Sequence, residues 1–316
     1  MADSAPETSS NGSAEGSPGG RVTMRTLRGM KRRGDAFACL TCYDATSARW
    51  LDRAGVEVLL IGDTAAEMIL GYERTIDMPL EIAIALTAAV RRGARRAMVM
   101  GDMPFLSYHC GDDESVGNAG RMMTEGQADV VKLEADASFA PLVERMTRSG
   151  IAVCGHVGSR PQTAALAGGY GSAGRTAGDA ERIVADAVAL EQAGAVMLLV
   201  EAVPAVVAER ILGATSVPLI GIGAGPACDG QILVLHDLVG MTEAPPRFAS
   251  RSAALGDALA EAGRDWVRRV RARSIGGEAY QMREGELEAF ERAMPAAGLP
   301  RDGNAPGVDS RGADSR

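Results

Sequence analysis

The chain has 316 residues, 46% of them hydrophobic, with a formal net charge of −8 and an isoelectric point near 5.1. This length allows one large domain or two ordinary ones, and the acidic balance argues against a nucleic-acid-binding protein. The sequence contains no run of 18 or more apolar residues, so we expect no transmembrane helix and no membrane partner.

Both ends of the chain have the composition of disordered tails. Residues 1–20 are mostly Ser, Gly, Ala, Glu and Pro, without the basic and apolar regions of a secretory signal, and residues 297–316 have the same character. We therefore predict a disordered N-terminal tail over 1–20, a single domain over 21–296, and a disordered C-terminal tail over 297–316.

The five cysteines are an odd number in a chain without an export signal, which favours a reduced, cytoplasmic protein. Cys39-Leu-Thr-Cys42 has the C-x-x-C spacing of redox and zinc sites, but it lies within an apolar run. No second pair accompanies it to complete a zinc site. We therefore expect neither a redox nor a zinc function for this motif.

After the first tail, a basic and helical stretch over 21–34 precedes an alternation of apolar and helical stretches. The apolar runs, each of which predicts a buried strand, cover residues 36–43, 56–61, 97–100, 129–134, 151–154, 196–200, 218–222 and 231–235. The helical stretches cover residues 47–54, 80–92, 114–125, 138–148, 179–193 and 204–212. Ser138 is placed to cap the helix over 138–148. Two further helices are expected over 251–273 and 286–294.

Eight apolar strands separated by helices predict a parallel α/β fold. Eight such units in about 220 residues suit a (β/α)₈ TIM barrel better than an open sheet, which usually has fewer strands. The helices after residue 250 are extra elements added to this barrel. The sequence shows no second core and no internal repeat of fixed period.

Polar side chains follow the predicted strands at their C-terminal ends, where a barrel builds its active site. They are Asp63, Asp102, Lys132, Glu134, His156 and Glu201. Each one alone is equally compatible with a structural ion pair or a helix cap. Six such groups converging on one rim must balance one another or hold an ion.

Lysine is rare in this chain: of 33 basic residues only Lys31 and Lys132 are lysines. Lys132 ends a predicted buried strand, where a compact ammonium suits better than a planar guanidinium. Glu134 lies two residues further on and therefore shares its face of the strand. The structural alternative for these two residues is a satisfied ion pair at a strand end.

Asp63, Asp102 and Glu134 supply oxygen ligands from three different strands. Such a set, with room left for water and substrate, is typical of Mg²⁺ and not of zinc, which prefers Cys and His. Mg²⁺ held in this way can chelate a 2-oxo acid through its carboxylate and ketone oxygens. The metal then stabilises the enolate formed when the neighbouring carbon loses a proton.

The remaining strand-end residues have chemistry that suits such a substrate. Lys132 and His156 can share its negative charge, and Thr64 offers a hydroxyl and a backbone N–H to its carboxylate. Glu201 has no basic neighbour in sequence, and a carboxylate in apolar surroundings has a raised pKa that suits a general base. The alternative for His156 is a histidine of the core.

Two features near the last strands have weaker functional signals. His236-Asp237 follows the eighth strand; a structural pair is the favoured interpretation, and a catalytic role is the alternative. The Gly-rich stretch Gly221-Ile-Gly-Ala-Gly225 lacks the spacing of a phosphate-binding loop. Glycines at a strand end also allow a bulky ligand to come close to the backbone.

Several longer stretches resemble one known family, ketopantoate hydroxymethyltransferase (3-methyl-2-oxobutanoate hydroxymethyltransferase). They run in the family's order over residues 35 to about 240, and together they are far more specific than any one of them. Among them are Leu40-Thr-Cys-Tyr-Asp44, Ile61-Gly-Asp63, Asp102-Met-Pro-Phe105, Val131-Lys-Leu-Glu134, Cys154-Gly-His-Val-Gly158, Pro161-Gln162, Val200-Glu-Ala-Val-Pro204, Gly221-Ile-Gly-Ala-Gly225 and Asp229-Gly-Gln-Ile-Leu-Val234.

The resemblance implies a (β/α)₈ barrel of the phosphoenolpyruvate mutase and isocitrate lyase type, assembled as a homo-oligomer, commonly a decamer. It implies Mg²⁺ bound near Asp63 and Asp102, with Glu134 in or next to the coordination shell. Thr64 matches a serine that binds the substrate carboxylate. Lys132 and His156 match substrate contacts.

The implied reaction belongs to pantothenate biosynthesis in the cytoplasm. Glu201, which matches the proposed base, removes the C3 proton of 2-oxoisovalerate (3-methyl-2-oxobutanoate) to give a Mg²⁺-stabilised enolate. The enolate attacks the one-carbon unit of 5,10-methylenetetrahydrofolate, the co-substrate, and 2-dehydropantoate results. Free formaldehyde is the alternative carbon donor.

The sequence departs from the family pattern around this polar set. The family's Gly-Asp-Ser-Leu-Gly-Met is Gly62-Asp-Thr-Ala-Ala-Glu67 here, and its His-Leu-Gly-Leu-Thr-Pro-Gln is His156-Val-Gly-Ser-Arg-Pro-Gln162. Glu67 and Arg160 therefore add charge near the rim. Because a polar pocket rejects substrates that leave its groups unpaired, one hypothesis is a paralogue that hydroxymethylates a different 2-oxo acid in a specialised pathway.

Two further alternatives come from other classes. One is a 2-oxo acid lyase or mutase of the same superfamily, which usually carries a Lys-Lys-Cys-Gly-His motif. Cys154-Gly-His156 resembles that motif, but the two lysines are absent. The other is a degenerate barrel used as a scaffold, which predicts a broken metal set, whereas the strand-end carboxylates are all present.

Overall fold

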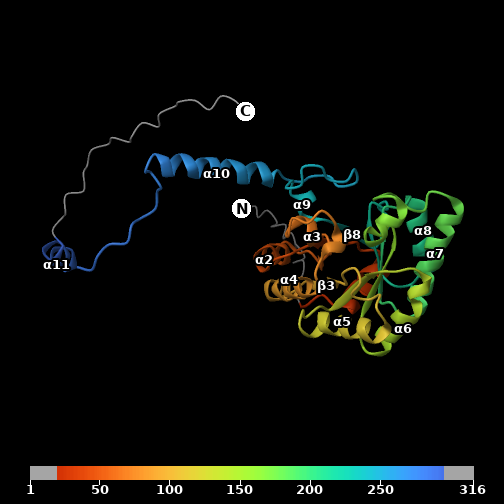
Figure 1. The fold of residues 1–316 in the computed structure, drawn as a ribbon. Helices are drawn as coiled ribbons and strands as arrows, with labels where there is room; N and C mark the ends of the chain where they lie inside the picture. The colour runs from red at the N-terminus through yellow and green to blue at the C-terminus, as the bar shows by residue number, and fades with distance from the viewer. Residues whose placement is uncertain (1–19, 295–316) are drawn as a thin grey trace, which may run out of the picture. The chain divides into compact units, whose positions relative to one another are not determined.

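Eight parallel strands close into a barrel in the computed structural model, which describes residues 20–294 (Figure 1). Each strand pairs with the next, and the last returns to the first with Ile232 opposite Cys39. In chain order the strands are β1 (Phe37–Thr41), β2 (Val58–Ile61), β3 (Met98–Asp102), β4 (Val130–Glu134), β5 (Val153–Gly158), β6 (Met197–Glu201), β7 (Leu219–Ile222) and β8 (Gly230–Leu233). The predicted (β/α)₈ barrel is confirmed.

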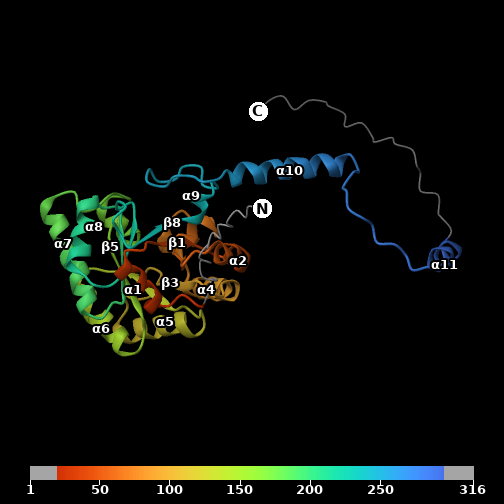
Figure 2. The ribbon, with the colours of Figure 1, turned by 180° about the vertical axis from the view of Figure 1, so that it is seen from behind.

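Helices cover the outside of the barrel, as the two opposite views in Figures 1 and 2 show. Their apolar faces pack on the strands and form one large buried cluster between sheet and helices. The main covering helices are α2 (Ala45–Ala54), α4 (Leu80–Gly93), α5 (Asp112–Thr124), α6 (Ala140–Arg148), α7 (Ala177–Gln192) and α8 (Ala205–Ala214). Each overlaps a helical stretch predicted from the sequence.

Helix α1 (Met24–Arg33) closes the end of the barrel where the strands begin. Its Leu27 is fully buried in the cluster that fills the barrel interior, together with Phe37 and other residues from the strands. Lys31 Nζ lies 2.7 Å from Asp229 Oδ2, just before β8, so an ion pair adds to this apolar contact. With this end filled, the barrel opens only at the C-terminal ends of its strands.

Short elements complete the loops at that open end. They are α3 (Ala65–Met68), α9 (Leu235–Leu238) and three 3₁₀ turns, η1 (Thr75–Asp77), η2 (Ala137–Phe139) and η3 (Pro161–Ala167). The sequence analysis did not predict these elements, because a single turn has no measurable apolar period. Several of them line the cavity described below.

The predicted cap of the fourth helical stretch is wrong. Ser138 lies inside η2, and the cap is the carboxylate of Asp136, which accepts a hydrogen bond of 3.0 Å from the Ser138 backbone N–H. The helix α6 itself begins two residues later, with Pro141 in its first turn. An aspartate at the end of a strand loop is a stronger acceptor for free N–H groups than the serine after it.

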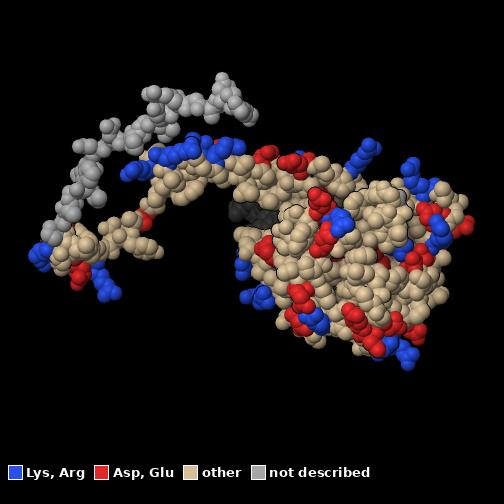
Figure 3. Space-filling model, in the orientation of Figure 1, with Lys and Arg blue, Asp and Glu red and all other residues tan. Residues whose placement is uncertain are grey.

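The chain divides into two compact units, Met1–Leu259 and Ala260–Arg316. The two extra helices expected from the sequence are α10 (Leu255–Arg271) and α11 (Glu286–Ala293), and neither contains a buried residue. Arginine side chains gather along α10 on the face shown in Figure 3. Apart from Gly20, the two predicted tails lie outside the described residues.

Within residues 20–294, the helices are all too short or too polar to cross a membrane.

Candidate active site

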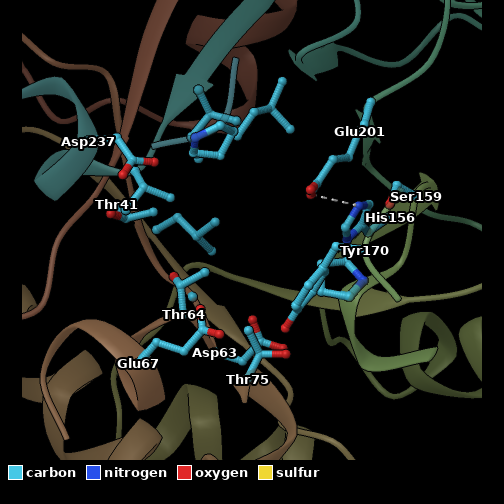
Figure 4. A pocket seen from close by; sticks show the side chains of 18 of the residues that line it. Thr41, Asp63, Thr64, Glu67, Thr75, His156, Ser159, Tyr170, Glu201 and Asp237 are labelled. Carbon is cyan, nitrogen blue, oxygen red and sulfur yellow. Dashed lines mark ion pairs between the residues drawn. The ribbon is translucent and has the colours of Figure 1, made fainter. Parts of the chain in front are cut away.

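A cavity of about 870 Å³ opens at the C-terminal ends of the strands. All seven residues that the sequence analysis selected contribute to its wall: Asp63, Thr64, Asp102, Lys132, Glu134, His156 and Glu201. They come from the turn after β2 and from β3 through β6, so residues far apart in sequence meet at one rim. Figure 4 shows several of them projecting into the cavity.

Lys132 and Asp102 form an ion pair at the floor of the cavity. The distance from Lys132 Nζ to Asp102 Oδ1 is 2.8 Å, and both side chains are almost completely buried. Burial alone would lower the pKa of Lys132, but Asp102, Asp63 and Glu134 together raise it, so the ammonium stays charged. Burial raises the pKa of Asp102 to about 7, although Lys132 opposes that shift.

Gln162, which follows β5, connects the carboxylates of this floor. Its side-chain Nε2 donates to Asp63 Oδ2 (2.9 Å), and its backbone N–H donates to Glu134 Oε2 (3.0 Å). Tyr108 donates its hydroxyl to Gln162 Oε1 at 2.7 Å, which fixes the orientation of the amide. Burial and the nearby Asp63 and Asp102 raise the pKa of Glu134 well above its usual value.

Gln162 and Tyr108 were not among the site residues predicted from the sequence. The only available signal was the position of Gln162 in a stretch that matches the family, a few residues after a strand end. Its contact with Asp63 joins residues that are 99 positions apart in the sequence. The turn η3 brings the glutamine back over the barrel, and that geometry is not visible in the sequence.

His156 lies between the floor and Glu201. Its Nδ1 is 3.5 Å from Lys132 Nζ, and its Nε2 is 3.5 Å from Glu201 Oε2, as the dashed line in Figure 4 marks. Burial and the positive charges of Lys132 and Arg160 lower the pKa of His156 well below its usual value, so the ring is neutral. Because His156 lines the cavity, it is not sealed within the core.

Glu201 is the least enclosed carboxylate of the group, with 23% of its side chain exposed where it lines the cavity. Burial raises its pKa to about 7, against the opposing charge of Lys132. The next residue, Ala202, has a left-handed backbone with φ of 49°, which is unfavourable for a residue with a Cβ. Such strain at a strand end is characteristic of functional sites.

A second group of polar residues extends the cavity wall beyond the floor. The Thr64 hydroxyl lies 2.6 Å from the hydroxyl of Tyr43. Glu67 and Tyr170 also line the cavity, and Figure 4 shows both side chains directed into it. Burial and the charge of Asp63 raise the pKa of Glu67. This wall is therefore acidic where the family pattern has methionine.

The charges of the site fit a divalent cation. Asp63, Asp102, Glu134 and Glu201 are four carboxylates, and among the described residues lining the cavity floor Lys132 is the one charged base, because His156 is neutral. Burial is the main cause of the raised pKa values of Asp102 and Glu134, and the neighbouring carboxylates add to it. Asp102 Oδ1 also has no hydrogen-bond partner within the described chain, despite its ion pair.

These carboxylates do not form a closed metal cage. Within residues 20–294, no three His, Cys, Asp or Glu side chains are arranged to hold a metal ion by themselves. Mg²⁺ keeps several waters and needs only one or two carboxylates together with oxygens of the substrate. The oxygen donors therefore fit Mg²⁺ bound with a substrate, and the metal-ligand set remains a prediction.

A family model described as ketopantoate hydroxymethyltransferase matches residues 21–277. The chain belongs to this family. Among its relatives is the 3-methyl-2-oxobutanoate hydroxymethyltransferase of Halorhodospira halophila, which is 48% identical over 271 residues, covering 86% of this chain and 98% of that protein. The predicted membership of the ketopantoate hydroxymethyltransferase family and the predicted enzyme class, a hydroxymethyltransferase, are confirmed.

Solved structures with the same fold are more distant in sequence. Phosphoenolpyruvate phosphomutase from Streptomyces platensis subsp. rosaceus aligns with a TM-score of 0.58 at 13% identity, covering 86% of this chain and 99% of that one. A 2,3-dimethylmalate lyase of the PEP mutase/isocitrate lyase superfamily aligns with a TM-score of 0.53 at 18% identity, covering 87% and 98%. These similarities confirm the predicted barrel type.

Proposed function

We propose that this chain transfers a hydroxymethyl group from 5,10-methylenetetrahydrofolate to 3-methyl-2-oxobutanoate, giving 2-dehydropantoate in pantothenate biosynthesis. The names of its relatives support the acceptor and the reaction class. The observation that carries the proposal is Glu201, a cavity carboxylate with a pKa of about 7 that has no Lys or Arg ion-pair partner within the described chain. A group with that pKa can accept a proton from carbon at neutral pH.

The floor of the cavity would bind the 2-oxo acid end of the acceptor. Lys132 offers a charged ammonium, and the Thr64 hydroxyl can donate to the substrate carboxylate. Neutral His156 can donate one ring N–H while its other nitrogen accepts. Asp63, Asp102 and Glu134 would hold Mg²⁺, which when bound supplies a Lewis acid for the ketone oxygen.

The first chemical step is removal of the C3 proton of the acceptor. Glu201 takes this proton on a carboxylate oxygen, and the electron pair of the broken C–H bond moves into the enolate. His156 Nε2, 3.5 Å from Glu201 Oε2, is close enough to orient the carboxylate through small movements. Lys132 balances the negative charge that develops on the substrate oxygen.

The second step forms a carbon–carbon bond. Two bonds form at the methylene carbon of the folate, one to the C3 carbanion and one to the oxygen of water, and its two carbon–nitrogen bonds break. The two departing nitrogens take up one proton each: the proton that Glu201 accepted from C3, and one proton of the water whose hydroxyl enters the new hydroxymethyl group. The products are 2-dehydropantoate and tetrahydrofolate, with one water consumed.

Proton exchange at C3 tests the first step without folate. Wild-type protein with Mg²⁺ and 3-methyl-2-oxobutanoate in D₂O is followed by NMR, and we expect the C3 proton signal to disappear. Glu201→Gln should slow this exchange by roughly 10²- to 10⁴-fold, as loss of a general base does. Glu209→Gln, an exposed glutamate on α8, is the matched control. Exchange that survives in Glu201→Gln rules out Glu201 as the base.

A second acceptor is favoured by one observation. Glu67 places a carboxylate with a raised pKa in the cavity wall, where a branched aliphatic side chain would offer it no donor beyond the Tyr170 hydroxyl. The same exchange assay, run with 2-oxo acids that carry a hydroxyl or amine on the side chain, tests this alternative. Exchange of 3-methyl-2-oxobutanoate alone would exclude it.

We also propose that the protein works as a homo-oligomer, commonly a decamer in this family, in the cytoplasm. The support is the sequence resemblance. Light scattering of the purified full-length protein measures the oligomer size. A monomer at micromolar concentration would contradict the proposal.

A further inference from the structure

The cavity is larger than a small 2-oxo acid requires. Its volume of about 870 Å³ lies in the upper part of the range that encloses drug-sized ligands. Figure 4 shows two sides: Glu201, His156 and Tyr170 lie on one, and Asp237 and Thr41 lie on the other. Since the acceptor and its base occupy the first side, the second side is free for another ligand.

Asp237, on the short helix α9, is a buried carboxylate without a protein partner. Only 5% of the residue is exposed, and the side chain lines the cavity. Within the described chain its carboxylate accepts no hydrogen bond and joins no ion pair. His236 does not pair with it as the sequence analysis interpreted; its ring packs on Tyr43 with 5.6 Å between ring centroids. A buried carboxylate of this kind needs donors from elsewhere.

Phe248 provides an aromatic part of the cavity wall that also contains Asp237. It lines the cavity and is 41% exposed. The ring packs directly on Gly223 at the end of β7, where an added Cβ would lie 2.7 Å from a ring carbon. Gly223 also has a φ of 59°, so glycine serves here both the turn and the approach of the ring. The packing fixes the ring in place and leaves it available for stacking.

Arg247 adds a positive charge to the same wall. Its side chain is exposed, lines the cavity, and makes no ion pair within residues 20–294. The floor on the other side is rich in carboxylates, so this arginine is the complementary group for an anion entering from solvent. A carboxylate, an aromatic ring and an arginine therefore line the same cavity.

We propose that Asp237, Phe248 and Arg247 form the subsite for the tetrahydrofolate donor, an inference that rests on the proposed function. The aminopyrimidinone edge of the pterin carries two adjacent N–H donors, which match the two oxygens of the Asp237 carboxylate. The pterin ring stacks on Phe248. The carboxylates of the glutamate tail pair with Arg247, and the methylene carbon then faces the acceptor beside Glu201.

Binding of the pterin head and binding of the glutamate tail can be measured separately with two ligands. The full-length protein is titrated by calorimetry with tetrahydrofolate and with 6-methyltetrahydropterin, which lacks the tail. Asp237→Asn should raise the dissociation constants of both roughly 10- to 100-fold, because a charge-assisted bidentate contact is lost. Arg247→Gln should raise only that of tetrahydrofolate, by about fivefold at most, as expected for an exposed ion pair.

Matched controls remove the same charges elsewhere on the surface. Asp257→Asn and Arg210→Gln change exposed residues outside the cavity, and we expect neither dissociation constant to move. Unchanged binding of both ligands in Asp237→Asn overturns the proposal, as does a wild-type protein that binds neither ligand. An equal loss of both ligands in Arg247→Gln would also overturn the assignment of the tail.

The C3 exchange assay distinguishes a failure of this inference from a failure of the proposed function. Exchange needs the acceptor and Glu201 but no folate. A wild-type protein without exchange contradicts the proposed function itself. If the wild-type protein exchanges the C3 proton but Asp237→Asn binds folate as tightly as wild type, the proposed subsite is wrong and the proposed function stands.

Discussion

The floor and the outer wall of the cavity differ in how completely their polar groups are satisfied. On the floor, Asp63, Asp102, Lys132 and Glu134 are held by ion pairs and hydrogen bonds and are almost completely buried. On the wall, Glu67 and Asp237 face the cavity. The difference indicates that the protein itself determines the geometry of the floor, whereas Glu67 and Asp237 have few protein partners and are free to bind ligands.

Replacing Lys132 should have the largest effect of the changes considered for the floor. Lys132→Met leaves Asp102 buried without its counter-charge, so we expect the free energy of unfolding to fall by about 3–5 kcal/mol. Urea unfolding between pH 6 and pH 9 measures this loss. Because Lys132 lowers the pKa of Asp102, that pKa lies above about 7 in the variant, so Asp102 takes up a proton there and the loss shrinks as the pH falls towards 7. A variant as stable as wild type across this range would show that the pair does not hold the floor.

Gln162 tests whether the floor is organised for a metal. Gln162→Ala removes the donor to Asp63 Oδ2 and loosens the carboxylates that it connects. We expect Mg²⁺ affinity to weaken about 10- to 100-fold, as for partners that orient metal ligands. Calorimetric titration with Mg²⁺ measures it, and Gln281→Ala, outside the cavity, is the control. Equal Mg²⁺ affinity in both variants would show that Gln162 does not contribute to metal binding.

The pH dependence of turnover tests Glu201. Because a base must be ionised, the rate of C3 exchange should rise with pH and level off above about pH 7, where the carboxylate is ionised. Below that pH it should fall about tenfold per unit. Initial rates between pH 5 and pH 9 check this, within the range where the protein stays folded by circular dichroism. A flat profile would exclude Glu201 as the base.

Glu67 gives the smallest expected effect and tests the wall. Glu67→Met replaces the carboxylate by the family's apolar residue, so kcat/KM for 3-methyl-2-oxobutanoate should rise several-fold relative to that for a hydroxylated 2-oxo acid. Competition between the two acceptors measures the ratio directly. Glu114→Met, an exposed position on α5, controls for the loss of charge. An unchanged ratio would show that Glu67 does not contact the acceptor.

The barrel and its rim were predictable because they depend on local patterns. Apolar runs marked all eight strands, and the C-terminal ends of β2 to β6 identified seven of the residues that line the cavity, from Asp63 to Glu201. A barrel of parallel strands brings the C-terminal ends of all its strands to one side, so residues at these ends were expected to lie close together without any knowledge of the distances between them. The roles of these residues remain predictions until they are measured.

Other features depend on contacts that the sequence does not display. Gln162 reaches Asp63 only because η3 folds back over the barrel. Asp136 caps η2 in place of Ser138 because the loop after β4 ends one turn earlier than the apolar period indicates. Asp237 lost its expected histidine partner because the His236 ring packs on Tyr43. For Gln162 and Asp237 tertiary packing decides which groups meet, and no local pattern in the sequence displays it.

Because lysine is rare in this chain, chemical labelling of its lysines can be used to follow the opening of the barrel. Lys132 is buried in the floor, and Lys31 is mostly covered where α1 pairs with Asp229. Since the chain has only these two lysines, reagents that modify amines will label the folded chain slowly at both side chains. Modification of Lys31 will record the release of α1, and modification of Lys132 will record the opening of the barrel itself. Mass spectrometry of a labelling time course therefore follows two unfolding events separately, without any engineered probe.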